Sequence, residues 1–406
     1  MSKGTPEQYD KPFHGYQVPD VYLEDTYQLP RHEEFLTGVP AFLGVVPKPS
    51  KLIREAKKLQ SHMLSLWAHF FSYIGEPTND CWLAYAVRGF FENGGERCYV
   101  VVLRDRSAAS LEDGLQVIAH QHTIDLVCAP DLVKDREKAF DLQQQLVDHC
   151  ETTGDRFAIL DSRLGDSNEH LWQQWSAING SNGAIYCPWV KVHPLDDSHD
   201  GRSVTVPPCG YVAGVYSRTD YGRGVHKAPA NEVLQGVLGL ERHLTDEDQA
   251  FLNPKRVNCI RSFPGRGIRV WGARTLSNDN NWMYVNVRRL FLTAIRWIEW
   301  HMKGVVFEPN DTRLWSEIER ELTGYFLEVY QSGALQGATP QAAFYVKCDA
   351  ETNPPELREL GQVVTEIGLA PAVPYEFIVV RLIHGASGVS ISGPLRPEQT
   401  YKKKRN

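Results

Sequence analysis

Short apolar runs that alternate with helical stretches constrain the fold of the middle of this chain most strongly. The runs lie at 98–103, 124–130, 157–161 and 184–190, and stretches of helical character at 136–150 and 169–178 lie between them. Continuous apolar runs are typical of strands buried on both faces, and strands that alternate with helices are typical of a mostly parallel sheet. We therefore predict an α/β domain over residues 36–250.

A different pattern extends from residue 251 to residue 385. Two short strand candidates, 257–263 and 268–276, are joined by Pro264-Gly265-Arg266-Gly267, which is a strong hairpin signal. Apolar residues then recur at helical spacing over 284–303 and 312–330, and Pro309-Asn310-Asp311 offers a cap between the two helices. With further strands expected at 342–349 and 377–384, we predict a second domain of α+β type that includes the hairpin.

The two ends of the chain differ in charge. Residues 1–40 contain five prolines, with three basic and seven acidic side chains, a net charge of −4. Prolines break helices but are tolerated on edge strands, so we predict an extended acidic arm over residues 1–35, with strand-forming residues at 16–25. Residues 386–406 are predicted to form a second arm with a basic tail, because the net charge from residue 396 onward is +4.

The overall composition excludes several classes of protein. The 406 residues carry a net charge of −7, which argues against a general nucleic-acid binder. The eight cysteines form no C-x-x-C pair and sit mostly in apolar runs, so we interpret them as buried, reduced thiols rather than zinc ligands. No apolar run approaches a membrane span, and the first residues lack a secretory signal, so we expect cytoplasmic synthesis, no cofactor and no membrane insertion.

Enzyme motifs are weak in this sequence. The stretch 196–203 places Asp, Ser and His close together, but a hydrolytic triad is assembled by fold geometry rather than by adjacency. His120 and His122 have no nearby set of carboxylates or cysteines to complete a metal site. The glycines of the hairpin lie between two strands instead of opening a helix, where a phosphate cradle needs them. We therefore predict no enzymatic activity.

Arginines and a tryptophan gather in and beside the hairpin. An exposed hairpin with these residue types suits a protein interface, where both are enriched, better than a nucleic-acid site in an acidic chain. Salt bridges to a neighbouring acidic chain and a solvated face are the alternatives. The candidates for contact between subunits are Arg261, Arg266, Arg269, Trp271 and Arg274.

Several segments of the chain, in the same order, resemble the tail sheath proteins of contractile phage tails and related contractile injection systems. The strongest matches lie in the last third, at 253–277, 282–295, 306–311, 333–337, 344–355 and 367–382. Weaker matches lie at 38–44, 128–131, 207–220 and 227–231, and residues 16–25 resemble the Y-x-x-P-G-V-Y-x-E-E pattern of the family, with Asp20 in place of its glycine.

The resemblance implies a structural subunit that polymerises as six-fold helical rings around an inner tube and contracts to drive that tube through a target envelope. It implies contacts with further copies, with paralogous sheath proteins in some particles, and with the tube, baseplate and terminator or cap proteins. The length is that of a compact sheath, as in a phage, a bacteriocin-like particle or an extracellular injection system. Assembly is expected in a bacterial cytoplasm, with release by lysis.

The family also implies strand exchange by both arms. The N-terminal arm residues are Tyr16, Val18, Val21, Tyr22, Leu23 and Glu24, and the C-terminal candidates are Val389, Ile391, Lys402, Lys403, Lys404 and Arg405. A helix of the C-terminal domain faces the tube in the family. Two acidic stretches are open for that role, one with Glu317, Glu319 and Glu321 and the other with Glu356 and Glu359.

The same resemblance implies that the middle domain has a subtilisin-like α/β fold without proteolysis. A catalytically active hydrolase is therefore the competing hypothesis, and another tail or baseplate protein is the second alternative. The G-T-S-x-A context of the subtilisin serine does not occur here, and its nearest counterpart, residues 385–390, lies outside the α/β domain.

Overall fold

The computed structural model describes residues 35–196, 203–372, 378–385 and 388–395. The chain divides into the units Met1–Glu34 and Phe35–Asn406, and the described residues belong to the second. The predicted N-terminal arm, including residues 16–24, lies outside the described residues, as do the basic tail and most of the 196–203 stretch. In the described part of the chain, no helix is both long and apolar enough to span a membrane.

A nine-stranded sheet forms the middle of the protein. Strands β3, β1, β4, β5, β6 and β11 run parallel, while β2, β12 and β9 join antiparallel at the two edges. This confirms the prediction of a mostly parallel α/β sheet. In sheet order the strands are β2 (Ser61–Leu64), β3 (Cys98–Val102), β1 (Pro40–Gly44), β4 (Leu126–Cys128), β5 (Phe157–Asp161), β6 (Gly183–Cys187), β11 (Val257–Phe263), β12 (Gly267–Val270) and β9 (Glu232–Val233).

Helices cover both faces of this sheet because successive strand residues point in opposite directions. On β1, Phe42 packs into one apolar core, whereas Ala41 and Leu43 pack into another. Helices α2 (Trp82–Glu92) and α6 (Cys209–Arg223) close the first core, and α3 (Ala108–Ile118), α4 (Ala139–Thr153) and α5 (Asn168–Ala177) close the second. The predicted helices at 136–150 and 169–178 are thus confirmed as α4 and α5.

Glycines allow α2 and α6 to approach each other closely. A Cβ atom added to Gly210 would lie 2.1 Å from the carbonyl oxygen of Ala86, and one on Gly214 would lie 2.6 Å from that of Phe90. Neither distance is tolerable for a larger residue, since both neighbours are helix backbone. The glycines in the 207–220 segment are therefore explained by helix packing.

The hairpin at 257–270 belongs to the large sheet. Val257, Asn258 and Cys259 pair in parallel with Ile185, Tyr186 and Cys187 of β6, and β11 then turns antiparallel into β12. The hairpin is confirmed, but its assignment to the C-terminal domain is wrong, because β11 extends the parallel sheet of the middle domain. A small sheet nearby has the order β10-β7-β8, formed by Val237–Leu240, Val190–Val192 and Val204–Val206. The short helices α1 and α7 span Lys51–Glu55 and Asp246–Leu252.

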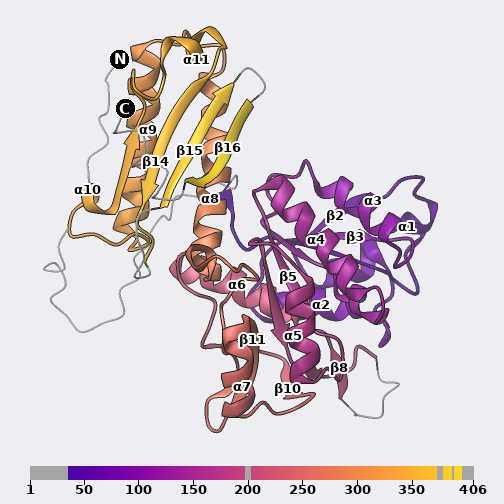
Figure 1. Ribbon diagram of the computed structural model, residues 1–406. Helices are drawn as coiled ribbons and strands as arrows, with labels where there is room; N and C mark the ends of the chain where they lie inside the picture. Colours follow the sequence, from indigo (N-terminus) through magenta and orange to yellow (C-terminus); the bar gives the residue numbers. More distant parts are fainter. Residues whose placement is uncertain (1–34, 197–202, 373–377, 386–387, 396–406) are drawn as a thin grey trace, which may run out of the picture. The chain divides into compact units, whose positions relative to one another are not determined.

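A third core is built from two long helices and a four-stranded antiparallel sheet. Helix α8 (Val285–His301) and helix α9 (Thr312–Gln331) match the predicted 284–303 and 312–330 closely. The Asp311 side chain caps α9 by accepting hydrogen bonds from the backbone N–H groups of Arg313 and Leu314, as expected. The sheet order is β13 (Phe344–Lys347), β14 (Val363–Leu369), β15 (Ile378–Gly385) and β16 (Gly388–Leu395) (Figure 1). Short helix α10 (Pro340–Ala343) directly precedes β13, and α11 (Pro355–Glu359) lies between β13 and β14.

All eight cysteines are free and buried. Burial raises the pKa of the Cys81 thiol to about 12, so this thiol stays protonated at neutral pH. The prediction that the cysteines act as small buried hydrophobic residues is confirmed.

Candidate functional site

The predicted contact arginines of the hairpin bind groups of their own chain. Arg261 donates to the Gln249 side chain at 2.7 Å and pairs with Asp246 of α7 at 2.8 Å. Arg274 donates to the carbonyl oxygen of Asn253 at 2.8 Å. These two side chains therefore hold the hairpin against α7 and the turn that follows it.

Arg269 and Arg266 converge on a third point, Asn231. Arg269 donates to its carbonyl oxygen at 2.6 Å, and Arg266 donates to its side-chain oxygen at 3.3 Å. Trp271 packs against Phe263, with ring centroids 4.5 Å apart. Of these four arginines, only Arg266 is largely exposed. The structure thus explains these residues as internal braces, and a role in subunit contact stays a prediction that Arg266 fits best.

The acidic candidates for the tube surface lie on two different helices. On α9, Leu314, Ile318 and Leu322 enter the third core, while Glu317 and Glu319 are exposed and Glu321 is half-buried. On α11, Glu356 and Glu359 are both exposed. Both helices present carboxylates to solvent, so the choice between them remains open.

The four-stranded sheet has β13 and β16 as its outer strands. The predicted C-terminal arm residues Val389 and Ile391 lie on β16, where they pair with His384 and Leu382 of β15. The segment 388–395 is therefore a strand of the chain's own sheet, and its exchange between copies stays a prediction. Lys402, Lys403, Lys404 and Arg405 lie outside the described residues.

A buried ion cluster joins α8 to the large sheet. Arg289 donates to both carboxylate oxygens of Asp220 on α6 at 2.9 and 2.6 Å, and to Asp125 at 2.9 Å. All three residues are at most 8% exposed. Burial lowers the pKa of Arg289, but the two carboxylates more than offset this and raise it above its ordinary value. The cluster is therefore a fixed charged clamp.

Asp125 extends the clamp to the entry of β1. Its carboxylate accepts hydrogen bonds from the backbone N–H groups of Gly38 and Val39 at 3.0 and 2.6 Å. About two turns of helix beyond Arg289, Arg296 donates to the carbonyl oxygens of His122 and Leu36 at 2.9 and 3.2 Å. Helix α8 is consequently tied to the same loops at two levels.

Sequence reasoning missed this clamp, although a signal exists. Arg289 stands in a helix whose positions 285–287 and 289–292 are all buried, so its charge has no route to solvent. A buried arginine needs carboxylates close by. The sequence does not identify them, because Asp220 and Asp125 lie 69 and 164 residues away.

Asp161 is the buried carboxyl that an enzymatic hypothesis would select as a candidate acid or base. Burial raises its pKa to about 7, and it accepts a hydrogen bond from the backbone N–H of Cys209, the first residue of α6, at 2.8 Å. Its carboxyl therefore caps a helix. Among the described residues, no group of three or more His, Cys, Asp or Glu side chains is placed to hold a metal ion.

Two family models match adjoining parts of the chain. Residues 106–276 match the phage tail sheath protein central domain, and residues 277–383 match the phage tail sheath C-terminal domain. The tail sheath protein of Salmonella phage ViI is 27% identical over 187 residues, which are 45% of this chain and 28% of that protein. The chain thus spans less than a third of that relative's length.

Solved structures match over a larger share of this chain than the Salmonella phage protein does. A chain in the contracted helical sheath of the anti-feeding prophage is 30% identical, with a TM-score of 0.70, and the match covers 89% of this chain and 98% of that one. A chain in the baseplate of the same particle is 31% identical with a TM-score of 0.72, again covering 89% and 98%.

Proposed function

This chain belongs to the phage tail sheath family, and we propose that it is the structural subunit of a contractile sheath. Copies polymerise as six-fold helical rings around an inner tube, and contraction of the polymer drives the tube through a target envelope. The observation that carries this proposal is the match to the contracted anti-feeding prophage sheath, which spans 89% of this chain and 98% of that one.

The outer strands of the four-stranded sheet supply the second support. An edge strand leaves one row of backbone N–H and C=O groups available, and an extended segment of another copy adds to it through main-chain hydrogen bonds. In the described residues, β13 and β16 are such edges. We assign the incoming strand to residues 16–24, and the acidic arm and the basic tail then attract each other between copies.

The Arg289 clamp supports a rigid-body mechanism. A sheath that shortens must move subunits relative to one another while each stays folded, which is the logic of switches built from rigid bodies and connecting segments. Because α8 is fixed to Asp220 and Asp125, the subunit moves as one piece and the arms act as hinges.

The remaining partners follow from the same assignment. The inner tube contacts an acidic helix face, either Glu317, Glu319 and Glu321 or Glu356 and Glu359, and baseplate and cap proteins bind the ends of the polymer. Assembly takes place in a bacterial cytoplasm, and lysis releases the particle.

We assign the α/β layer to a non-proteolytic relative of the subtilisin-like fold. The parallel sheet with helices on both faces supports this assignment. Within the part of the chain that the structure describes, the buried Asp161 carboxyl caps α6, which does not favour the hydrolase alternative.

Negative-stain electron microscopy of the purified full chain tests the proposal. We expect tubes or rings with six-fold symmetry. A variant without residues 1–25 should remain a folded monomer by circular dichroism but form no long tubes, since the added strand is missing. Normal-length tubes from that variant would refute strand addition by the arm, and a full chain that never polymerises would refute the sheath function itself.

A further inference from the structure

Phe307 is presented to solvent in a conformation that a bulky residue rarely adopts. Its φ is +76°, and its side chain is 101% exposed. A positive φ is a genuine outlier for such a residue, and strained residues of this kind cluster at functional positions. The adjoining Val306 is also exposed, so an apolar tip projects from the turn between α8 and α9.

The structure holds this turn firmly on both sides. Met302, just before it, is fully buried in the third core. Just after it, Asn310 donates to the carbonyl oxygen of Gln362 at 2.9 Å and accepts from the indole N–H of Trp315 at 2.8 Å. The strain at Phe307 is therefore built in, and nothing in the described chain covers its ring.

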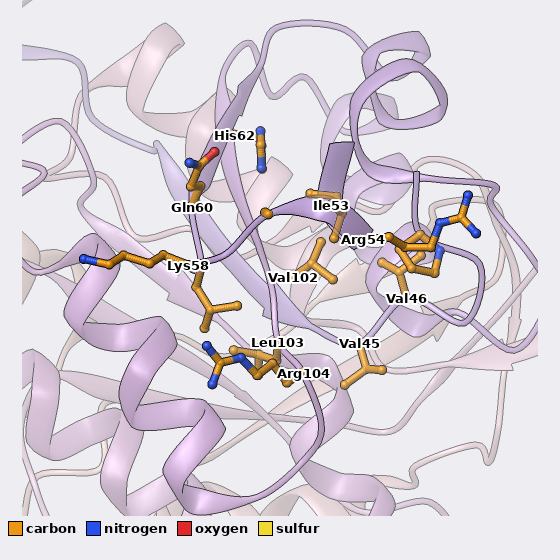
Figure 2. A pocket seen from close by; sticks show the side chains of 13 residues that line it. Val45, Val46, Ile53, Arg54, Lys58, Gln60, His62, Val102, Leu103 and Arg104 are labelled. Carbon is orange, nitrogen blue, oxygen red and sulfur yellow. The ribbon is translucent and has the colours of Figure 1, made fainter. Parts of the chain in front are cut away.

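A hollow of about 340 Å³ lies at the carboxyl ends of β1 and β3. Apolar side chains line it, namely Val45, Val46, Ile53, Leu59, Val102 and Leu103. Its charged lining residues are all basic: Arg54 and Lys58 lie on opposite sides in Figure 2, and Arg104 lies below. Arg104 also pairs with Asp113 at 3.5 Å. The hollow therefore suits an apolar group next to an acidic one.

The turn offers that combination, because exposed Glu308 follows Phe307 directly and has no ion-pair partner among the described residues. We propose that Phe307 and Glu308 of one copy dock into this hollow of a second copy, with the ring on the apolar floor and the carboxylate among Arg54, Lys58 and Arg104. Charge complementarity of this kind fixes the register between partners.

The two surfaces belong to opposite ends of the subunit's strand β1. Phe35, which precedes β1, packs against Trp300 and His301 just before the turn. Val45 and Val46, which follow β1, line the hollow. The five residues of β1 span roughly 16 Å. A contact between two different surfaces of identical copies can repeat from copy to copy, and it builds a ring where the rotation closes and a helical polymer where it does not. The inference thus rests on the proposed sheath function and adds a specific contact to it.

Cysteine cross-linking tests the contact in the full chain, because all eight native thiols are buried. Protein carrying Glu308→Cys is copolymerised with protein carrying either Lys58→Cys or Arg54→Cys, then oxidised and run on a non-reducing gel. We expect a covalent dimer with at least one of the two partners. Glu317→Cys, an exposed carboxylate on α9, replaces Glu308→Cys as the matched control and should give no such dimer.

The variant Phe307→Gly removes the side chain that makes the contact without impairing folding of the subunit. Glycine accepts a positive φ without strain, so the unfolding midpoint should stay equal or rise. Loss of the aromatic anchor should raise the critical concentration for polymerisation about tenfold or more. Two outcomes would overturn the contact while leaving the sheath function intact. The cysteine variants would form normal tubes without either cross-link, or Phe307→Gly would polymerise at an unchanged critical concentration. Loss of binding to a tube alone would assign Phe307 to the tube, and absence of all polymers would refute the sheath function together with this contact.

Discussion

Replacing Arg289 by methionine is expected to destabilise the protein strongly and in a pH-dependent way. Methionine keeps much of the buried volume but removes the partner of Asp220 and Asp125, which are 8% and 5% exposed. Breaking a buried ion pair by removing one member typically costs about 3–5 kcal/mol, because the remaining charge is left without compensation. Here Asp220 loses its ion-pair partner, whereas Asp125 keeps Arg296 at 3.9 Å, so we expect a loss within that range at pH 7.5.

The pH dependence follows from Asp220. Burial raises its pKa above the ordinary value of 3.8, and Arg289 opposes that rise. In the variant the pKa should rise further, so the folded state binds a proton more tightly than the unfolded state does. A raised carboxyl pKa stabilises at low pH and loses that contribution as pH increases through the folded pKa. The loss caused by Arg289→Met should therefore be smaller at pH 5.0 than at pH 7.5, by about 1.4 kcal/mol for each unit of the additional shift that falls between these two pH values.

Urea unfolding followed by tryptophan fluorescence at the two pH values measures both effects. Arg288→Met is the matched control, since Arg288 binds the Asn182 side chain at 2.5 Å and lies over the Trp282 ring. Among the described residues it forms no ion pair, and the nearby Glu151 acts on it only as a more distant charge. Because no ion pair is broken, we expect it to cost about 1 kcal/mol, with little dependence on pH between 5.0 and 7.5. Equal losses for the two variants, or a loss for Arg289→Met that does not change with pH, would refute the reasoning.

Two further predictions concern buried groups. Asp161→Asn keeps an oxygen that accepts the hydrogen bond from the backbone N–H of Cys209. Because burial raises the pKa of Asp161 to about 7, the wild-type protein loses stability as the pH rises from 4 to 7. The variant should therefore be more stable than the wild type at pH 8, by on the order of 2 kcal/mol in urea titrations. No difference at pH 8 would contradict the buried charge. Phe326→Ala should cost about 3–5 kcal/mol in the same assay, since the ring is 1% exposed in the third core, whereas Leu360→Ala, at 68% exposure, should change stability by under about 0.5 kcal/mol.

Local patterns predicted much of this fold. The apolar stripes of α8 and α9 located both helices to within a few residues, and the Asp311 cap placed the start of α9. The runs at 98–103, 157–161 and 184–190 correspond to β3, β5 and β6. These succeeded because helical periodicity and strand hydrophobicity are properties of neighbouring residues.

Long-range pairing accounts for what the sequence did not predict. The hairpin was recognisable from its turn, but its membership of the large sheet depends on parallel pairing between Val257 and Ile185, which no local pattern encodes. The candidate site has the same limit. Arg269 braces Asn231 instead of facing outward, and this depends on how close β12 lies to β9. The exposure of Phe307 also depends on the packing of the surrounding elements.

Helix α8 contributes side chains to two apolar cores, and this limits the changes in length that the helix tolerates. Val285 and Leu292 pack into the first core, whereas Phe291 and Ile298 pack into the third. One residue inserted into the helix would rotate everything after it by about 100°, because an α-helix has 3.6 residues per turn. The later side chains would then leave their core, so a one-residue insertion or deletion within α8 should be strongly destabilising.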